Sequence, residues 1–365
     1  MPLISLTKAH SSDRPLHQTA AAPPKGTGRL SQIDFTKGAL VLIMALYHWL
    51  NYFVLPPNSN YHFVYLNWFV ITPSSLYKYL RFLPPSFIFI TGFLISHLYV
   101  SEHRSWDQRI PGRLLRRGLK LLMIVMLANM ATGPTRVTAF AARVSSWNPE
   151  DILFLYLTGI APLVFYVLVP IAYLLIVSAG LLICSRYYHQ IFHVMCAVSV
   201  ACALLLEVRG LNSGYLQMLS IGMIGISIGY IPIDRISQFA QSRLMKGAGY
   251  TSYLIAITFL DIYVVQIIGV CLSLANIYRI GVTTINTSPA RVFILLGHYS
   301  LFGYIIQIVI LQILQRSLRV SGTAIGTRIT ALLICISGTI LCVALLDRLR
   351  ATHITVNKAY VALFA

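Results

Sequence analysis

Apolar runs of about 20 residues recur through most of this 365-residue chain, and they constrain the fold more than any other feature. A helical run of that length matches the roughly 30 Å hydrocarbon core of a bilayer. Hydrophobic residues make up 57% of the chain and charged residues 10%, whereas a soluble domain carries about 25% charged residues. The sequence therefore predicts an all-α, polytopic integral membrane protein.

We expect about ten transmembrane helices in one bundle. Their ranges are 36–54, 79–99, 114–132, two helices within 150–185, 189–206, 214–231, 251–275, 292–314 and 325–347. Residues 150–185 are too long for one span and short for two, so we divide them at Pro170, where proline interrupts the helical hydrogen-bond ladder. Residues 1–31 contain no signal-peptide pattern and are expected to form a disordered cytoplasmic tail, followed by a membrane domain (32–350) and a C-terminal tail (351–365).

The positive charges follow the positive-inside rule better at the front of the chain than at the back. The formal charge of +18 comes from Lys and Arg in short loops, which indicates membrane topology rather than nucleic-acid binding. The basic loop 101–117 and the N-terminal tail are expected to face the cytoplasm. With ten spans Arg235, Arg243 and Lys246 face outward, and with nine they face inward. Charge favours nine spans, the length of residues 150–185 favours ten, and we adopt ten.

The first span carries a polar group at each end. Asp34 and Lys37 lie at its start, and His48 follows eleven residues after Lys37, roughly 16 Å along the helix and on the same face. A neutral imidazole can accept a proton from an attacking hydroxyl. Two plainer interpretations stay open: His48 anchors the helix end at the interface beside Trp49, and Asp34 and Lys37 suit the helix dipole and the membrane boundary.

A cationic stripe is expected at the start of the third span, because four basic residues recur at helical spacing. They are Arg113, Arg116, Arg117 and Lys120. Arginine forks match phosphate geometry, so the stripe is a candidate site for the phosphates of a nucleotide-bearing donor. Ordinary positive-inside topology and contact with anionic lipids are the alternative.

Polar residues within later spans are further candidates. Asp261 lies in an expected span, where a carboxylate indicates a functional site unless it pairs within the bundle. Gln307 and His298 are similar cases in the ninth span.

Two apparent signals are set aside. The six cysteines lie in apolar runs without ligand spacing, so we expect neither metal binding nor disulfides. Residues 225–229 match the Gly-x-Ser-x-Gly pattern of hydrolases, but that elbow requires a strand-to-helix turn. Here we expect small-residue packing within a transmembrane helix.

Four motifs lie in order along the chain: Asp34-Phe-Thr-Lys37-Gly38 with His48, Phe87–Ser96, Arg113-Leu-Leu-Arg116, and Leu296–Leu301 with Tyr304. Together they resemble the membrane-bound acyltransferase-3 family. One position departs from the family pattern: Lys37 stands where an arginine is usual, which keeps the charge but loses the bidentate fork. Asp151–Tyr156 further resembles the branch that modifies periplasmic glucans, often with succinyl groups.

The resemblance implies a multi-pass enzyme of the bacterial inner membrane that moves an acetyl or succinyl group from cytoplasmic acyl-coenzyme A to a hydroxyl of an extracytoplasmic glycan. His48 would be the acyl-transfer histidine, as general base or transient acyl carrier. Lys37 would replace the family's arginine, and Asp34 would orient it. The residues that would hold the donor phosphates are Arg113, Arg116 and Arg117. No metal or tightly bound cofactor is implied, and homo-oligomerisation is left open.

Two rival functions stay open. A transporter or flippase would move an anionic or lipid-linked substrate past His48 and Asp261, and it would show interrupted helices in matching positions of two halves, which the sequence does not reveal. An assembly or sensor protein would not need the polar residues at the start of the first span.

Overall fold

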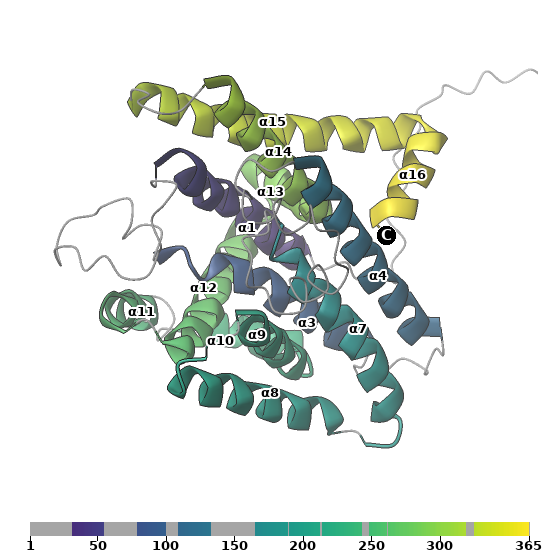
Figure 1. The fold of residues 1–365 in the computed structure, drawn as a ribbon, viewed down its shortest axis with the longest axis vertical. Helices are drawn as coiled ribbons and strands as arrows, with labels where there is room; N and C mark the ends of the chain where they lie inside the picture. Colours follow the sequence, from purple (N-terminus) through teal and green to yellow (C-terminus); the bar gives the residue numbers. More distant parts are fainter. Residues whose placement is uncertain are drawn as a thin grey trace, which may run out of the picture. The chain divides into compact units, whose positions relative to one another are not determined.

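The computed structural model describes residues 31–54, 79–99, 109–132, 165–188, 190–211, 214–242, 248–260, 262–318 and 325–364. Every regular element in these ranges is helical. The helices are α1 (Ser31–Trp49), the π-helix η1 (Leu50–Val54), α3 (Leu83–Tyr99), α4 (Arg109–Thr132), α7 (Leu168–Ser185), α8 (Ile191–Val208), α9 (Gly214–Ile228), α10 (Ile233–Gln241), α11 (Ala248–Phe259), α12 (Tyr263–Thr284), α13 (Ser288–His298), α14 (Ser300–Leu318), α15 (Ile325–Thr352) and α16 (Ile354–Phe364) (Figure 1).

The structure confirms an all-α membrane protein. Within the described ranges, six helices are long and apolar enough to cross a bilayer, or seven if the bent pair α9 and α10 forms one span. The first expected span corresponds to α1 with η1, and others correspond to α8 and α15. The expected N-terminal tail lies outside the described residues, apart from Ser31, whereas residues 351–365, expected as a tail, include α16.

Two spans expected to be continuous are interrupted. The range 251–275 holds parts of two helices: α11 ends at Phe259 and α12 begins at Tyr263. The range 292–314 holds α13 and α14, which are separated at Tyr299. A third break separates α9 from α10, whose axes differ in direction by 107°. Hydropathy did not reveal the first two breaks, because the few polar residues at them, Asp261, His298 and Ser300, lie within longer apolar runs.

The predicted division at Pro170 is displaced by two residues, because α7 begins at Leu168 after a turn at residues 165–167. Pro170 lies in the first turn of α7, which begins at Leu168 and continues to Ser185. A proline at this position is compatible with the helix, because backbone N–H groups of the first turn have no intrahelical acceptor. The preceding residues 150–164 lie outside the described part of the chain.

Helix α1 is the most buried of the candidate spans, with 72% of its apolar window buried inside the protein. It packs most extensively on α13, and the two backbones touch at two glycines. A Cβ on Gly38 would overlap the carbonyl oxygen of Phe293, and a Cβ on Gly297 would overlap the carbonyl oxygen of Asp34. Since Gly38 faces Phe293 and Gly297 faces Asp34, the two helices run antiparallel.

A second glycine contact joins α3 to α9. A Cβ on Gly92 would overlap the carbonyl oxygen of Gly222, and one on Gly225 would overlap the carbonyl oxygen of Phe89. Gly225 and Ser227 lie within α9. This contact confirms the interpretation of residues 225–229 as small-residue helix packing rather than a nucleophile elbow.

The contacts of α12 relate the loops at one end of the bundle. Gly281, near the end of α12, packs on Phe35 in the first turns of α1. Helix α10, which carries Arg235, also packs on α12, and Tyr278 of α12 lies beside Ser237 of α10. Arg235 therefore lies at the same end of the bundle as Lys37. This is the side on which the charge argument placed it, rather than the side that a ten-span count requires.

Apolar side chains remain exposed on the outer helices. Only 11% of the apolar window of α8 and 22% of that of α15 is buried. Helix α4 exposes an apolar row at helical spacing: Leu115, Leu119, Met123, Met126 and Leu127. Such faces are suited to contact with lipid tails, so α1 forms the interior of the bundle and α4, α8 and α15 form parts of its surface.

Gly38→Ala is expected to lower the melting temperature of the detergent-purified protein, because the added methyl must separate α1 from α13. The cost of such overpacking is about 1–3 kcal/mol. Gly180→Ala is the matched control, since it is also a helical glycine but has open space around its Cβ position. That control should melt at the wild-type temperature or slightly above it, because alanine is more favourable than glycine in a helix by up to about 1 kcal/mol. Equal melting of both variants would contradict the close α1–α13 contact.

Candidate functional site

His48 lies in the last turn of α1 and points into the protein rather than to a membrane surface. Its side chain is buried, with a residue exposure of 6%. The imidazole lies 5.6 Å from the ring of Tyr304 on α14 and 5.8 Å from the ring of Tyr47, measured between centroids. Tyr304 in turn contacts Phe87 and Phe165. The alternative in which His48 anchors the helix end at the interface does not fit this burial.

The segment after His48 is held by hydrogen bonds to two other helices, α14 and α15. The chain passes directly from α1 into the π-helix η1, a feature that is frequent at functional sites. The indole of Trp49 donates a hydrogen bond of 2.6 Å to the carbonyl oxygen of Arg328. Gln312 and Gln315 of α14 donate hydrogen bonds of 3.3 Å to the hydroxyl and the carbonyl oxygen of Tyr52. These contacts fix the position of the imidazole relative to α14.

Several buried polar atoms around His48 have no hydrogen-bond partner within the described part of the chain. They are His48 Nδ1, the Tyr304 hydroxyl, and both Oε1 and Nε2 of Gln307. Tyr304 and Gln307 are three residues apart on α14, so they share one face of that helix. A buried polar group without a partner costs about 1–3 kcal/mol, so this group is suited to binding a polar ligand or water.

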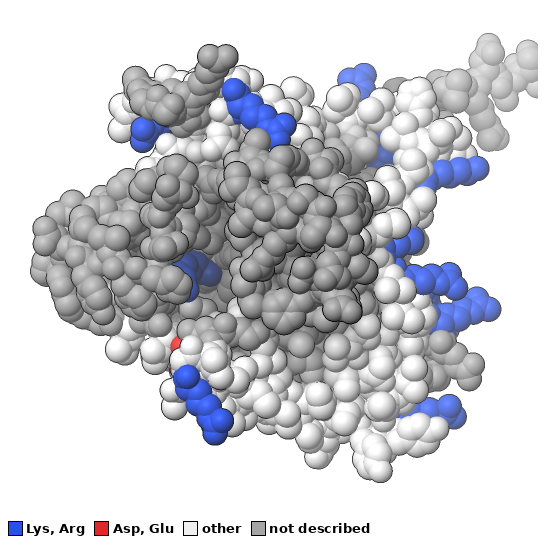
Figure 2. Space-filling view, in the orientation of Figure 1, with Lys and Arg blue, Asp and Glu red and all other residues white. Residues whose placement is uncertain are grey.

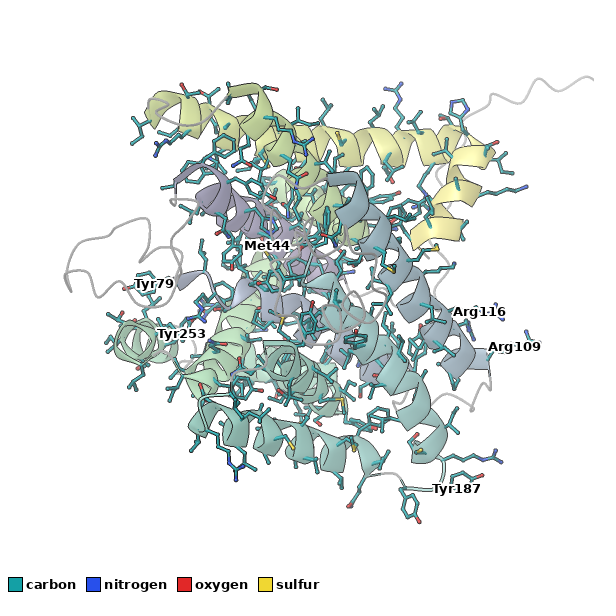
Figure 3. All side chains as sticks on the ribbon, viewed as in Figure 1. Met44, Tyr79, Arg109, Arg116, Tyr187 and Tyr253 are labelled. Carbon is teal, nitrogen blue, oxygen red and sulfur yellow. The ribbon has the colours of Figure 1, made fainter. Side chains whose placement is uncertain are left out.

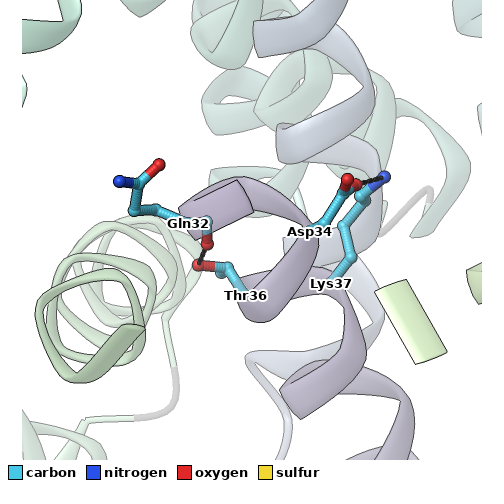
Figure 4. Close-up of polar contacts among 4 residues, drawn as sticks. All are labelled: Gln32, Asp34, Thr36 and Lys37. Atoms are coloured by element: carbon cyan, nitrogen blue, oxygen red, sulfur yellow. Dashed lines mark hydrogen bonds and ion pairs between the residues drawn. The ribbon is translucent and has the colours of Figure 1, made fainter. Parts of the chain in front are cut away.

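Asp34 and Lys37 form an ion pair at the opposite end of α1. The distance between Lys37 Nζ and Asp34 Oδ1 is 2.6 Å, and the two side chains are 19% and 7% exposed (Figure 4). Thr36 donates a hydrogen bond to the carbonyl oxygen of Gln32 in the same turn. The structure thus brings Asp34 and Lys37 together, but they are separated from His48 by about three helical turns, roughly 16 Å.

The arginine stripe lies on α4, away from both of these groups. Arg113, Arg116 and Arg117 are exposed on the first turns of the helix. Figure 3 shows Arg116 projecting outward, and Figure 2 shows basic side chains along the same edge of the molecule. Helix α4 packs closely on α7 at Gly118, where a Cβ would lie 2.9 Å from the carbonyl oxygen of Ala172. The stripe exists as predicted, but it is not part of the group around His48.

The other polar candidates have different surroundings. His298 is exposed and stacks on Tyr299 at the break between α13 and α14. The Tyr299 hydroxyl donates a 2.6 Å hydrogen bond to Asp347 of α15. Asp261 lies outside the described residues, in the interval between α11 and α12. Of these candidates, only Gln307 lies one helical turn from Tyr304, whose ring is next to His48.

A cavity of about 150 Å³ lies beside His48 and contains residues that the sequence analysis missed. Its lining includes Arg81, Gln217 and Gln266, together with the rings of Tyr47 and Tyr166. An isolated polar residue within an apolar stretch indicates a candidate functional site, and Gln217 and Gln266 are such residues. The sequence could not show that these residues, which belong to different helices, line one space.

The described residues contain no cluster of three or more His, Cys, Asp or Glu side chains that could hold a metal ion, and their six cysteines are free thiols. Comparison of the chain with profiles of known protein families, with characterised proteins and with solved structures found no match. The functional argument therefore depends on the four motifs and on the geometry around His48.

Gln307→Met is expected to raise the melting temperature, because it removes buried amide atoms that have no partner among the described residues while conserving volume. The expected gain is about 1–3 kcal/mol. Tyr263→Phe is the contrasting variant, since it removes a hydroxyl that is hydrogen-bonded to Ser220, and it should lower the melting temperature. If both variants destabilise the protein equally, the Gln307 amide has a structural partner and is not available to a ligand.

Proposed function

We propose that the chain is a membrane-bound O-acyltransferase of the bacterial inner membrane, built on a bundle of transmembrane helices. It moves an acetyl or succinyl group from cytoplasmic acyl-coenzyme A to a hydroxyl of an extracytoplasmic glycan. The observation that carries this proposal is the buried imidazole of His48, whose Nδ1 lies without a partner among the described residues and beside Tyr304. The four ordered motifs of the acyltransferase-3 family supply the reaction class.

The position of His48 along α1 suits a reaction between substrates from the two sides. Lys37 lies at the end of α1 expected to face the cytoplasm, and His48 is roughly 16 Å further along the helix. That distance is about half of a hydrocarbon core of roughly 30 Å. A group at this depth is within reach of an acyl chain entering from one side and of a hydroxyl entering from the other.

In the general-base route, His48 accepts the proton of the acceptor hydroxyl while the hydroxyl oxygen bonds to the acyl carbon. The carbon–sulfur bond of the thioester then breaks, its electron pair leaves with coenzyme A as a thiolate, and the thiolate takes the proton from His48. In the acyl-carrier route, the imidazole first takes the acyl group itself and then passes it to the hydroxyl. Both routes need an imidazole nitrogen that is not engaged in a structural hydrogen bond.

The remaining sequence-predicted residues have supporting roles in this proposal. Lys37, oriented by Asp34, supplies a positive charge at the cytoplasmic end of α1, where it can guide the anionic donor. The arginine stripe of α4 binds the phosphates of coenzyme A. The stripe is expected on the cytoplasmic side, like Lys37, because the loop before α4 is strongly basic. Acyl-coenzyme A is thus a substrate, and no tightly bound cofactor is required.

A transporter or flippase is the second candidate, and the helix interruptions favour it. Discontinuous helices line the substrate sites of many transporters. The break before α12 is stabilised, because Glu207 of α8 accepts a 2.9 Å hydrogen bond from the backbone N–H of Tyr263. Net substrate movement across vesicles in the absence of acyl-coenzyme A would distinguish this function from acyl transfer.

His48→Ala is expected to reduce acyl transfer by about 10²-fold or more, because the proton acceptor or acyl carrier is lost. The measurement uses reconstituted vesicles, radiolabelled acetyl- or succinyl-coenzyme A, and a glucan acceptor. His353→Ala is the control, since His353 is exposed at the junction of α15 and α16. Equal transfer by the His48 variant and the control would remove His48 from the mechanism.

Arg113→Gln combined with Arg116→Gln is expected to raise the KM for acyl-coenzyme A by about tenfold or more, with a smaller effect on kcat, because charge-assisted contacts to phosphate are lost. The effect should shrink at high salt. Arg235→Gln is a matched control, because this exposed arginine lies at the same end of the bundle as Lys37 but on α10. An unchanged KM in the double variant would contradict the phosphate-binding role of the stripe.

A further inference from the structure

The cavity of about 150 Å³ beside His48 is built from several separate helices. Tyr47 comes from α1, Pro84 and Pro85 from α3, Gln266 from α12, and Tyr166 from the turn before α7. The α9 residues that line it are Gly214, Gln217, Met218 and Ile221, and Arg81 lies just before α3. The space is partly open, but a wall shared among so many elements suits a specific ligand better than a flat surface does.

The chemistry of the lining indicates a negatively charged ligand. Arg81 is the only charged residue among the described residues that line the cavity. A guanidinium keeps its positive charge, and its planar pairs of N–H donors match the oxygens of a carboxylate or phosphate. The amides of Gln217 and Gln266 and the phenols of Tyr47 and Tyr166 add hydrogen-bonding groups around the same space.

The size of the cavity limits the ligand to one small group. A volume of 150 Å³ accommodates on the order of five water molecules at about 30 Å³ each. Coenzyme A is far larger, so this cavity cannot be the site for the donor's nucleotide. A carboxylate or phosphate attached to a few further atoms fits the space.

The cavity lies at the His48 end of the bundle. Gly281 of α12 packs on Phe35 near the start of α1, and Gln266 is about four turns earlier on α12. Two lining residues also contact the group around His48. The ring of Tyr47 lies 5.8 Å from the imidazole of His48, and Tyr166 interacts electrostatically with Tyr304.

We propose that this cavity binds a small oxyanion, a carboxylate or phosphate, through Arg81, with Gln217 and Gln266 as additional hydrogen-bonding residues. The identification of that oxyanion as part of the acyl group or acceptor that reaches His48 rests on the proposed acyl transfer. Binding of the oxyanion itself does not depend on that function.

The test is a binding measurement on the full chain in nanodiscs of neutral phosphatidylcholine. Succinate and inorganic phosphate are titrated separately by calorimetry, and glucose serves as a neutral comparator. Wild-type protein should bind at least one of the two oxyanions, and the stronger of the two identifies a carboxylate or a phosphate ligand. Arg81→Gln should weaken that binding by about tenfold or more. Arg209→Gln, which alters an exposed arginine at the end of α8, should bind as wild type does.

A separate variant distinguishes failure of this proposal from failure of the proposed enzyme. His48→Ala should lose acyl transfer yet retain oxyanion binding, because His48 is not among the residues that line the cavity. The proposal is overturned if neither oxyanion binds to wild-type protein, or if Arg81→Gln binds as tightly as Arg209→Gln. Binding of glucose that exceeds oxyanion binding and ignores Arg81→Gln would also overturn it. Oxyanion binding without acyl transfer in any variant would support the cavity and reject the enzyme.

Discussion

The backbone contact between α1 and α13 is the constraint on which the rest of the structure depends. Gly38 and Gly297 let the two backbones touch, and 72% of the apolar window of α1 is buried inside the protein. Only an enclosed helix can carry an ion pair at one end, and at the other an imidazole whose Nδ1 has no partner among the described residues, without exposing polar atoms to hydrocarbon. The same contact places Asp34 beside α13, near the break that starts α14 and brings Tyr304 to His48.

Hydropathy located the helices that run without interruption. It did not show where an apolar run is broken into two helices. The spans that became α1, α8 and α15 have long apolar runs and few charges, so their positions were predictable. The break between α11 and α12 does contain Asp261, and Tyr299 lies between His298 and Ser300, but one or two polar residues do not end an apolar run of about 20 residues. Pro170 predicted the start of α7 to within two residues, since a proline is tolerated in the first turn of a helix but not beyond it.

The candidate site was predicted in part, for a similar reason. His48, Tyr304 and Gln307 were recognisable because each is a polar group in an apolar run, and two of them belong to a motif. The cavity with Arg81 and Gln217 was missed, because it forms where separate helices meet and no local pattern encodes that meeting. The charge pattern, by contrast, was informative. It placed Arg235 on the side of Lys37, and the contacts of α10 and α12 agree.

The surroundings of Lys37 explain how a lysine can replace the arginine of the acyltransferase-3 pattern that this chain resembles. An arginine binds a partner through a planar fork, whereas a lysine presents three rotatable donors on a flexible stem. At this position Asp34 fixes the stem, because its carboxylate lies 2.6 Å from Nζ one turn earlier on the same helix. The ion pair therefore supplies the orientation that an arginine fork would provide, and it leaves further ammonium donors for a second acceptor. A chain with lysine here depends on Asp34 more strongly than a chain with arginine would.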